Sequence, residues 1–360
     1  HTISKLMYAK DAEEEFKQKK LFETLNSRQN YFVYPNTLCR PQLPLGPEDQ
    51  PERCTIKNPK VIRHFFQPDE VIENRLVTME TGTRILQSPN GGVDLMRLKL
   101  HPQTIYPLLV SFKGIFEGLI KAHAAGITHN DIKPMNIVTR HMGRGKWKTR
   151  MIDLGLAFET STYPPMAERF AFESNYPWWG PELRFVNIDH VIHPAVDVDE
   201  WNRFSMEMDL PTSVLYRNVG GVYVPVVGVK YYQRLREELR SMTLNTRNHF
   251  LFTKSDVYGL GMVFLYMFAM IDKYLGDTNP ALKDKYNTLG GSVCLAFLQK
   301  MLHLNPFERF TMKDAYEMYT RQVLPTLKNV FQPFPFPQHP VAPRILRSSP
   351  NSLQPKYVAV

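Results

Sequence analysis

Two short segments of the chain, 129–136 and 153–155, carry residue types suited to catalysis. They read His-Asn-Asp-Ile-Lys-Pro-Met-Asn and Asp-Leu-Gly. Asp131 can accept the proton of a hydroxyl group, and Lys133 can neutralise negative charge on a group in transfer. We therefore take Asp131 and Lys133 as the candidate catalytic pair, and we name the two segments the 129–136 loop and the 153–155 segment.

Two further side chains of these segments suit a magnesium ion. Asn136 offers a neutral amide oxygen and Asp153 a carboxylate, which Mg²⁺ accepts together with phosphate oxygens. A base, a cation and metal-binding oxygens are what phosphoryl transfer asks of a protein, because positioning and electrostatic stabilisation supply most of its catalysis. Each acid taken alone is more often a surface residue or a cap, so the combination carries the prediction.

The elements on either side of these residues predict how they are positioned. Between 105 and 125 apolar residues recur at helical spacing, so one face of a long helix is expected to be buried and to lead the chain to His129. Residues 137–139 and 148–152 flank a turn rich in glycine and predict a hairpin between the two segments. Helical patterns dominate again after Ser255.

The first part of the chain predicts fewer regular elements. Residues 1–8 alternate as a short strand, and 11–25 read as a highly charged helix. Repeated prolines within 31–74 predict a long irregular connection. The runs 75–80 and 84–87 then predict an antiparallel hairpin.

The two segments resemble the catalytic and metal-binding loops of eukaryotic-type serine/threonine protein kinases. Residues 180–182, Gly-Pro-Glu, are similar to the Ala-Pro-Glu element of that family, and 254–261 to the start of its central buried helix. Residues 305–311 resemble the late segment whose arginine pairs with that glutamate. The resemblance therefore implies a structural ion pair between Glu182 and Arg309.

The same resemblance implies roles for residues near the start of the chain. Residues 2–6 are similar to the Val-Ala-Ile-Lys strand of the family, which makes Lys5 the candidate for binding the α- and β-phosphates of ATP. A glutamate of the following helix is expected to pair with this lysine. Glu15 is the first choice, with Glu14 and Glu23 as alternatives.

Asp94 comes after Gly91-Gly92, a stretch that resembles the exit from the nucleotide hinge. The residue is expected either to bind the ribose of ATP or to cap a helix. Asn130 stands where many family members have an arginine that receives a phosphate, which implies that loop phosphorylation is not the main switch. The residues that remain open to modification are Thr160, Ser161, Thr162 and Tyr163.

Two more departures from the family pattern lie before Lys5 and after Glu182. No glycine-rich loop precedes Lys5, so the loop lies upstream of His1 or is lacking. The stretch from Glu182 to Asp256 is longer than family spacing and implies an insertion; with the aromatic and proline residues at 176–182, it resembles the divergent kinases of large nucleocytoplasmic DNA viruses. In the insertion an irregular polar loop is favoured over a metal site built from Asp189, His190, His193, Asp197 and Asp199.

The resemblance implies an α+β, two-lobed, protein-kinase-like fold. Residues 1–92 are assigned to an incomplete, β-rich N-lobe and 93–330 to a larger, mainly helical C-lobe. The insertion occupies about 183–252, and 331–360 form an extended, proline-rich tail. With 360 residues, the chain is long enough for one large core or two modest ones.

Charge and cysteine content bound the partners and the compartment. The formal net charge of +9 suits an acidic partner such as nucleic acid, although basic residues spread along the chain favour a merely solvated surface. Neither a disulfide framework nor a zinc site is expected from three cysteines without CxxC spacing, so a reducing compartment, the cytoplasm, is expected. No signal peptide or transmembrane segment is expected, since the apolar stretch 257–271 is short and reads as a buried helix. The cysteines are Cys39, Cys54 and Cys294.

Four functions remain under consideration. The leading one is transfer of the γ-phosphoryl group of ATP, with Mg²⁺, to serine or threonine of a protein substrate; a viral member would act in the host cytoplasm or the virion, with virion or capsid proteins as partners. The second is a kinase-fold scaffold without catalysis, and the third a small-molecule phosphotransferase. The fourth is nucleic-acid binding by basic residues around Trp147, namely Arg140, Arg144, Lys146, Lys148 and Arg150.

Overall fold

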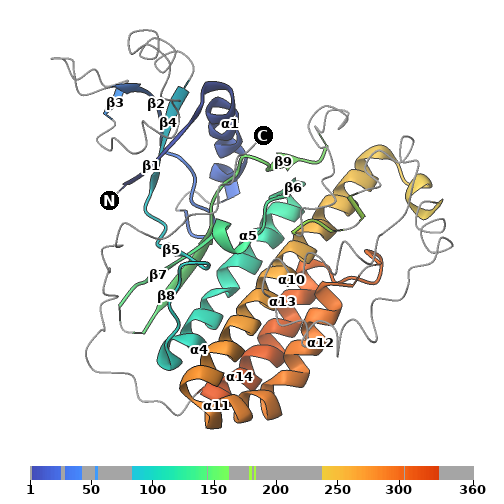
Figure 1. Ribbon diagram of the computed structural model, residues 1–360. Coiled ribbons are helices and arrows are strands. Elements are labelled where there is room, and N and C mark those ends of the chain that lie inside the picture. Colours follow the sequence, from blue (N-terminus) through green and yellow to red (C-terminus); the bar gives the residue numbers. More distant parts are fainter. Residues whose placement is uncertain are drawn as a thin grey trace, which may run out of the picture.

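The fold is mixed α+β, with small sheets and mostly helical content, in agreement with the predicted class (Figure 1). A computed structural model describes residues 2–25, 29–42, 53–55, 83–143, 145–161, 178–180, 182–183, 237–303 and 305–331.

The largest sheet has four strands in the order β1-β4-β2-β3 and lies at one end of the molecule (Figure 1). β1 (Thr2–Tyr8) pairs antiparallel with β4 (Thr83–Pro89), so that Lys5 stands opposite Leu86. The predicted first strand is therefore confirmed. β2 (Thr37–Gln42) is antiparallel to β4, and β3 (Arg53–Thr55) is parallel to β2.

Within 31–74, where few regular elements were expected, the described residues form two short strands, β2 and β3. β2 pairs with β4 only through Thr37–Cys39, so the missing N–H of Pro41 falls outside that ladder. The predicted hairpin is not seen in the part that the structure describes: 84–87 belong to β4, which has β1 and β2 as neighbours, and 75–80 lie outside the described residues.

Cys39 in β2 is disulfide-bonded, although the cysteine count favoured no disulfide framework. Spacing along the sequence does not show which strands the fold brings together, so a single bridge escapes that reasoning. Cys294 is a buried free thiol, and burial raises its pKa to about 12.

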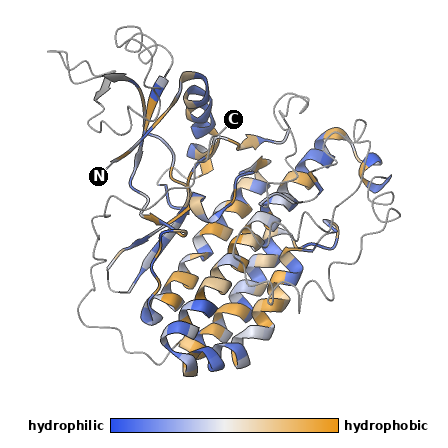
Figure 2. Cartoon of the chain, viewed as in Figure 1, coloured by the Kyte–Doolittle hydropathy of each residue, from blue (hydrophilic) through white to orange (hydrophobic). Residues whose placement is uncertain are grey.

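α1 (Ala9–Leu25) comes directly after β1 and matches the predicted charged helix. Figure 2 shows it as largely hydrophilic, and its buried residues are Ala12, Glu15 and Phe22. Phe22 packs on Phe32 with ring centroids 4.6 Å apart, which ties the helix to the core. Because a buried carboxylate needs a partner, Glu15 indicates an electrostatic role for this face of the helix.

A second sheet supports the candidate site. β5 (Val93–Asp94), β7 (Ile137–His141) and β8 (Trp147–Met151) form it, and the β7–β8 pair confirms the predicted hairpin. Gly92, with φ 120°, lets β5 approach β7 closely, since a Cβ there would lie 2.1 Å from the Thr139 carbonyl oxygen. Two short strands complete the β structure of the described residues: β6 (Ile127–Thr128) and β9 (Phe158–Glu159).

The remaining elements are helical, and α5 and α10 run side by side through the body of the molecule (Figure 1). In chain order they are α4 (Pro102–Ser111), α5 (Lys113–Ala124), α10 (Leu244–Thr278), α11 (Pro280–Lys285), α12 (Gly291–Met301), α13 (Met312–Met318) and α14 (Leu324–Phe331), with π-helical turns at Tyr286–Gly290 and Tyr319–Val323.

The single long helix expected between 105 and 125 is thus two helices that meet at Phe112. There the Ser111 hydroxyl donates to the Leu108 carbonyl, and the Phe112 N–H donates to Leu109 at 3.1 Å. Hydrogen bonds to the third preceding residue tighten the turn and interrupt the α-helix.

α10 is the centre of the hydrophobic core. Phe264 contacts the rings of Phe112, Phe116, Phe297 and Tyr319, with centroids 5.0 to 5.6 Å apart. Among the described residues α10 alone has the length and apolar composition of a membrane span, and 83% of that stretch is buried inside the protein. The prediction of a buried helix over 257–271 is confirmed.

The predicted ion pair between Glu182 and Arg309 is confirmed and wholly buried. The guanidinium is bidentate: Nη1 and Nη2 each donate to one carboxylate oxygen of Glu182, the second at 2.8 Å. Arg309 also donates through Nε to the His303 carbonyl and through Nη1 to the Lys254 carbonyl, each at 2.8 Å. One side chain therefore joins three segments of the helical part.

Arg309→Met should destabilise the protein by about 3 to 5 kcal/mol, because Glu182 would remain charged, buried and unpaired. Urea unfolding monitored by circular dichroism measures this. Arg321→Met is the matched control, since Arg321 is 77% exposed and lies 4.0 Å from Glu317, a geometry worth less than about 1 kcal/mol. Equal losses in the two variants would contradict a stabilising role for the buried pair.

Candidate active site

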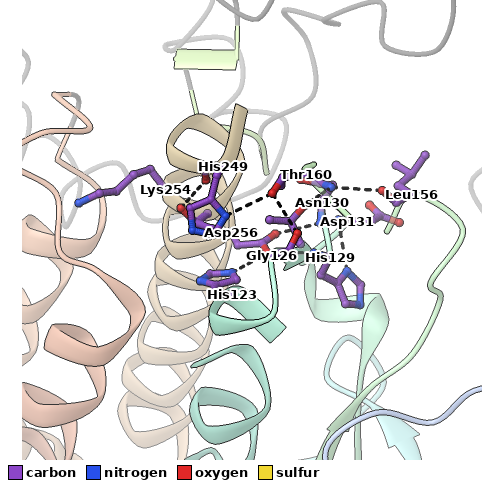
Figure 3. A network of polar contacts seen from close by, with 12 residues as sticks. His123, Gly126, His129, Asn130, Asp131, Leu156, Thr160, His249, Lys254 and Asp256 are labelled. Atoms are coloured by element: carbon purple, nitrogen blue, oxygen red, sulfur yellow. Dashed lines mark hydrogen bonds and ion pairs between the residues drawn. The ribbon is translucent and has the colours of Figure 1, made fainter. Parts of the chain in front are cut away.

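The 129–136 loop is fixed to α10 by one buried carboxylate. The backbone N–H groups of His129 and Asn130 both donate to Asp256, at 2.9 Å each. His123 of α5 contacts the same carboxylate through Nε2 at 3.0 Å (Figure 3). Asp256 thus joins α5, α10 and the loop at a single point.

Two residues of the candidate site adopt the left-handed conformation that favours glycine. Asn130 has φ 59° and Asp153 has φ 64°. Asn130 is held there by its Nδ2 donors to Thr128 Oγ1 at 2.9 Å and the Leu156 carbonyl at 3.2 Å, and its own carbonyl accepts from Trp179 Nε1 at 2.7 Å. Such conformations persist where surrounding contacts over-determine them, which is common at functional sites.

The structure brings Asp131, Lys133 and Asn136 together. Lys133 Nζ lies 2.9 Å from Asp131 Oδ2. A 3₁₀ turn at Pro134–Asn136 directs Asn136 back, so that its Nδ2 donates to Asp131 Oδ2 at 2.7 Å and to the Asp131 carbonyl at 3.0 Å. The N–H of Ile152 donates to the Asn136 carbonyl at 2.9 Å, which places the 153–155 segment beside the loop.

Lys5 meets two carboxylates from distant parts of the chain. Its Nζ lies 2.8 Å from Glu15 Oε2 and 3.2 Å from Asp153 Oδ1. Glu15 is therefore the glutamate that pairs with Lys5, while Glu23 pairs with Lys19 at 3.2 Å. The predicted contact between the first strand and the following helix is confirmed.

The pKa values of the two acids in this cluster shift in opposite directions. Burial would lower the pKa of Lys5, but Asp153 and then Glu15 outweigh it and raise that pKa. Burial raises the pKa of Glu15 more than Lys5 lowers it. The pKa of Asp153 is lowered against its burial, first by Lys5 and then by Lys133. The influence of Lys133 on Asp153 also links this cluster to the loop.

The oxygen donors suit a magnesium ion that also binds phosphate. Asp153 supplies a carboxylate, and Asn136 supplies the amide oxygen Oδ1, while its Nδ2 donates to Asp131. Two protein groups are fewer than octahedral Mg²⁺ needs, and phosphate oxygens and water ordinarily complete such a site. Across the described residues no group of three or more His, Cys, Asp and Glu side chains converges.

Asp94 caps a turn, and in the described part of the chain its polar partners lie in that turn rather than among the other candidate residues. Its Oδ1 accepts from the Arg97 N–H at 3.0 Å, and Oδ2 lies 3.6 Å from Arg97 Nε. Of the two roles expected for Asp94, this geometry matches the cap.

Sequence reasoning did not identify the contacts around Thr160. The Thr160 hydroxyl is buried, donates to the Gly126 carbonyl at 3.0 Å and contacts His249 Nδ1 at 3.3 Å (Figure 3). As folded, Thr160 is not open to modification, whereas Ser161 is exposed. Thr162, Tyr163 and the polar residues of the insertion lie outside the described residues.

Asp256 was included in the family resemblance over 254–261, but its hydrogen bonds to the 129–136 loop were not predicted. The sequence signal for these bonds is an acid inside a long apolar run, because a buried acid needs hydrogen-bond donors.

No protein-family model matches this chain, and no curated protein matches its sequence.

Lys254 predicts a pH dependence of stability. Burial, and then the charge of Arg309, lower its pKa from 10.5 to about 8, while its ammonium donates to the Arg309 carbonyl. Between pH 8 and 10.5 the unfolded chain binds this proton and the folded chain does not, so the contribution of Lys254 to stability rises with pH across this window.

Urea unfolding at a series of pH values measures this. From pH 8 to 10.5 the free energy of unfolding of wild type should rise by about 3 kcal/mol relative to that of Lys254→Met. Lys328→Met, which removes an exposed lysine of α14, should instead run parallel to wild type. Parallel curves for both variants would contradict the lowered pKa.

Proposed function

We propose that this chain transfers the γ-phosphoryl group of ATP to serine or threonine hydroxyls of a protein, within a two-lobed, protein-kinase-like fold. The observation that carries the proposal is the meeting of Lys5 with Glu15 and Asp153, from the first strand, α1 and the 153–155 segment. The sequence resemblance assigned phosphate, pairing and metal roles to these same residues. Under this proposal 1–92 form the small lobe and 93–330 the large one.

Each end of the ATP phosphates has a matching group. The Lys5 ammonium supplies donors for the α- and β-phosphates, and Glu15 holds that ammonium in position. Asp153 and Asn136 are the residues that would hold Mg²⁺, which supplies neutralisation of phosphate charge. Lys133 lies 2.9 Å from Asp131 Oδ2 and lowers the pKa of Asp153, so in this scheme its cation neutralises charge on the transferred group.

Asp131 takes the proton in this scheme. The hydroxyl oxygen of the substrate forms a bond to the γ-phosphorus, the bond from that phosphorus to the β–γ bridging oxygen breaks, and the hydroxyl proton passes to the Asp131 carboxylate. Lys133 and Asn136 both contact Asp131 Oδ2, so they fix the orientation of the carboxylate. Asp256 accepts the N–H groups of His129 and Asn130, the two residues directly before Asp131.

Asn130 indicates how such an enzyme would be regulated. Its side chain is tied to Thr128 and Leu156 and carries no charge, so it offers no cation to a phosphate on the following loop. We infer that phosphorylation of that loop is not the main switch of activity.

Asp131→Ala should reduce phosphate transfer roughly a hundredfold or more, because it removes the proton acceptor. Purified full-length chain, radiolabelled ATP, Mg²⁺ and casein as acceptor provide the assay. Glu317→Gln, at a partly exposed acid on α13, serves as control and should retain full transfer. Equal incorporation by wild type and Asp131→Ala would refute the assignment of Asp131.

Nucleotide binding gives a second prediction that does not depend on turnover. Mg²⁺ should increase the affinity for ATP roughly tenfold less in Asp153→Asn than in wild type, since one metal ligand loses its charge. Lys5→Met should weaken ATP binding with and without the metal. Isothermal titration with ATP and a non-hydrolysable analogue measures both; tight Mg²⁺-dependent binding by a wild type that transfers nothing would favour the scaffold function instead.

A further inference from the structure

A cavity of about 250 Å³ lies apart from the residues assigned to ATP and magnesium. It is formed where the end of α5, the first turns of α10 and the start of α13 meet. Most of its wall is apolar, with Ile120, Ala124 and Met312 among the lining residues. This volume accommodates a ligand of about the size of a benzene ring with one polar substituent.

The polar part of the wall is basic. Two histidines, His123 and His249, and two lysines, Lys254 and Lys313, line the same cavity. The nearby carboxylate of Asp256 is already bound to the loop and to His123, and that of Asp314 accepts from the N–H and hydroxyl of Thr311. The wall therefore has an excess of donors and positive charge.

Several of these groups have donors to spare. Lys254 has three N–H donors, of which the Arg309 carbonyl accepts one. His123 uses Nε2 for Asp256, and His249 uses Nδ1 for Thr160; within the described part of the chain the second nitrogen of each ring remains for a ligand. Lys313 is an exposed residue at the start of α13. An anion that contacts these groups would gain charge-assisted hydrogen bonds.

We propose that this cavity binds a phosphate monoester with a compact apolar body, such as an aryl phosphate. The apolar wall takes the body, and the lysines and histidines take the dianion. A dianion is favoured over a carboxylate because two lysines and two histidines line the same cavity. The phosphate monoester is either a free small molecule or a phosphorylated side chain of a peptide, which share this chemistry.

Hydrogen bonds connect the cavity to the proposed active site. His123 lines the cavity and contacts the Asp256 carboxylate, which in turn accepts the N–H groups of His129 and Asn130 (Figure 3). A phosphate that contacts the other ring nitrogen of His123 would shift the ring and so change its hydrogen bond to Asp256. Ligand binding is therefore coupled to the backbone that positions Asp131, through one carboxylate that both sites share.

Titration calorimetry of the full chain with phenyl phosphate tests the site. Wild type should bind it more tightly than inorganic phosphate or phenol, which each supply one half of the ligand. Lys313→Met should weaken binding roughly tenfold, the loss of one charge-assisted contact. Ala124→Phe should abolish binding by filling the cavity.

Two controls and one further ligand complete the experiment. Lys328→Met removes an exposed lysine outside the cavity, and Lys5→Met removes a group of the proposed ATP site; both should bind phenyl phosphate as wild type does. Binding that Lys313→Met and Ala124→Phe leave unchanged, or that Lys5→Met abolishes, would overturn the proposal. A phosphotyrosine peptide that binds more tightly than phenyl phosphate would identify the peptide as the source of the ligand, and weaker binding would identify the small molecule.

Amide hydrogen exchange tests the coupling without any phosphoryl-transfer measurement. Saturating phenyl phosphate should change the exchange of the His129 and Asn130 amides in wild type and not in Ala124→Phe. Unchanged exchange in ligand-bound wild type would overturn the coupling. Neither readout measures phosphoryl transfer, so the outcome for this cavity is independent of the outcome for the proposed kinase activity.

Discussion

The carboxylate of Asp256 is the point on which the geometry of the site depends. A charged group buried in a helical core costs several kcal/mol unless donors surround it, and here two backbone N–H groups and His123 supply them at 2.9 to 3.0 Å. Asn130 donates its N–H to this carboxylate while its backbone is in the left-handed conformation, so one hydrogen bond links the buried acid to the strained backbone.

Consecutive residues of α10 extend this control to other segments. Lys254 donates to the Arg309 carbonyl, Ser255 Oγ accepts the Gly180 N–H at 3.0 Å, and Asp256 holds the loop. One turn later the chain has no side chain at Gly259, where a Cβ would lie 2.9 Å from the Trp178 carbonyl oxygen. A shift of α10 by one residue would break all of these contacts, so the register of this helix fixes the loop.

The sequence predicted the local parts of this arrangement and missed the tertiary ones. Helical spacing and the Asp131 to Asn136 pattern are local, so the loop, the β7–β8 hairpin and α10 were foreseen. Glu182 and Arg309 were paired only through resemblance to a family, since nothing local joins residues so far apart. The β2 and β3 strands were missed because prolines read as breakers until the neighbouring ladder shows which N–H groups are needed. The links of Thr160 to His249 and of His123 to Asp256 depend on packing alone.

The cluster at Lys5 contains two carboxylates and one ammonium, and its charge is therefore negative when all three groups are ionised. The protein does not share that charge evenly: the pKa of Glu15 is raised by burial, while the pKa of Asp153 is lowered by Lys5 and Lys133. When two neighbouring acids are pushed apart in this way, they are suited to different tasks. Asp153 keeps the firmer negative charge and is the better ligand for a cation, whereas Glu15, enclosed by α1 and β1, is suited to orienting the lysine. The left-handed backbone at Asp153 directs this carboxylate to Lys5, so the strain and the electrostatics serve the same group.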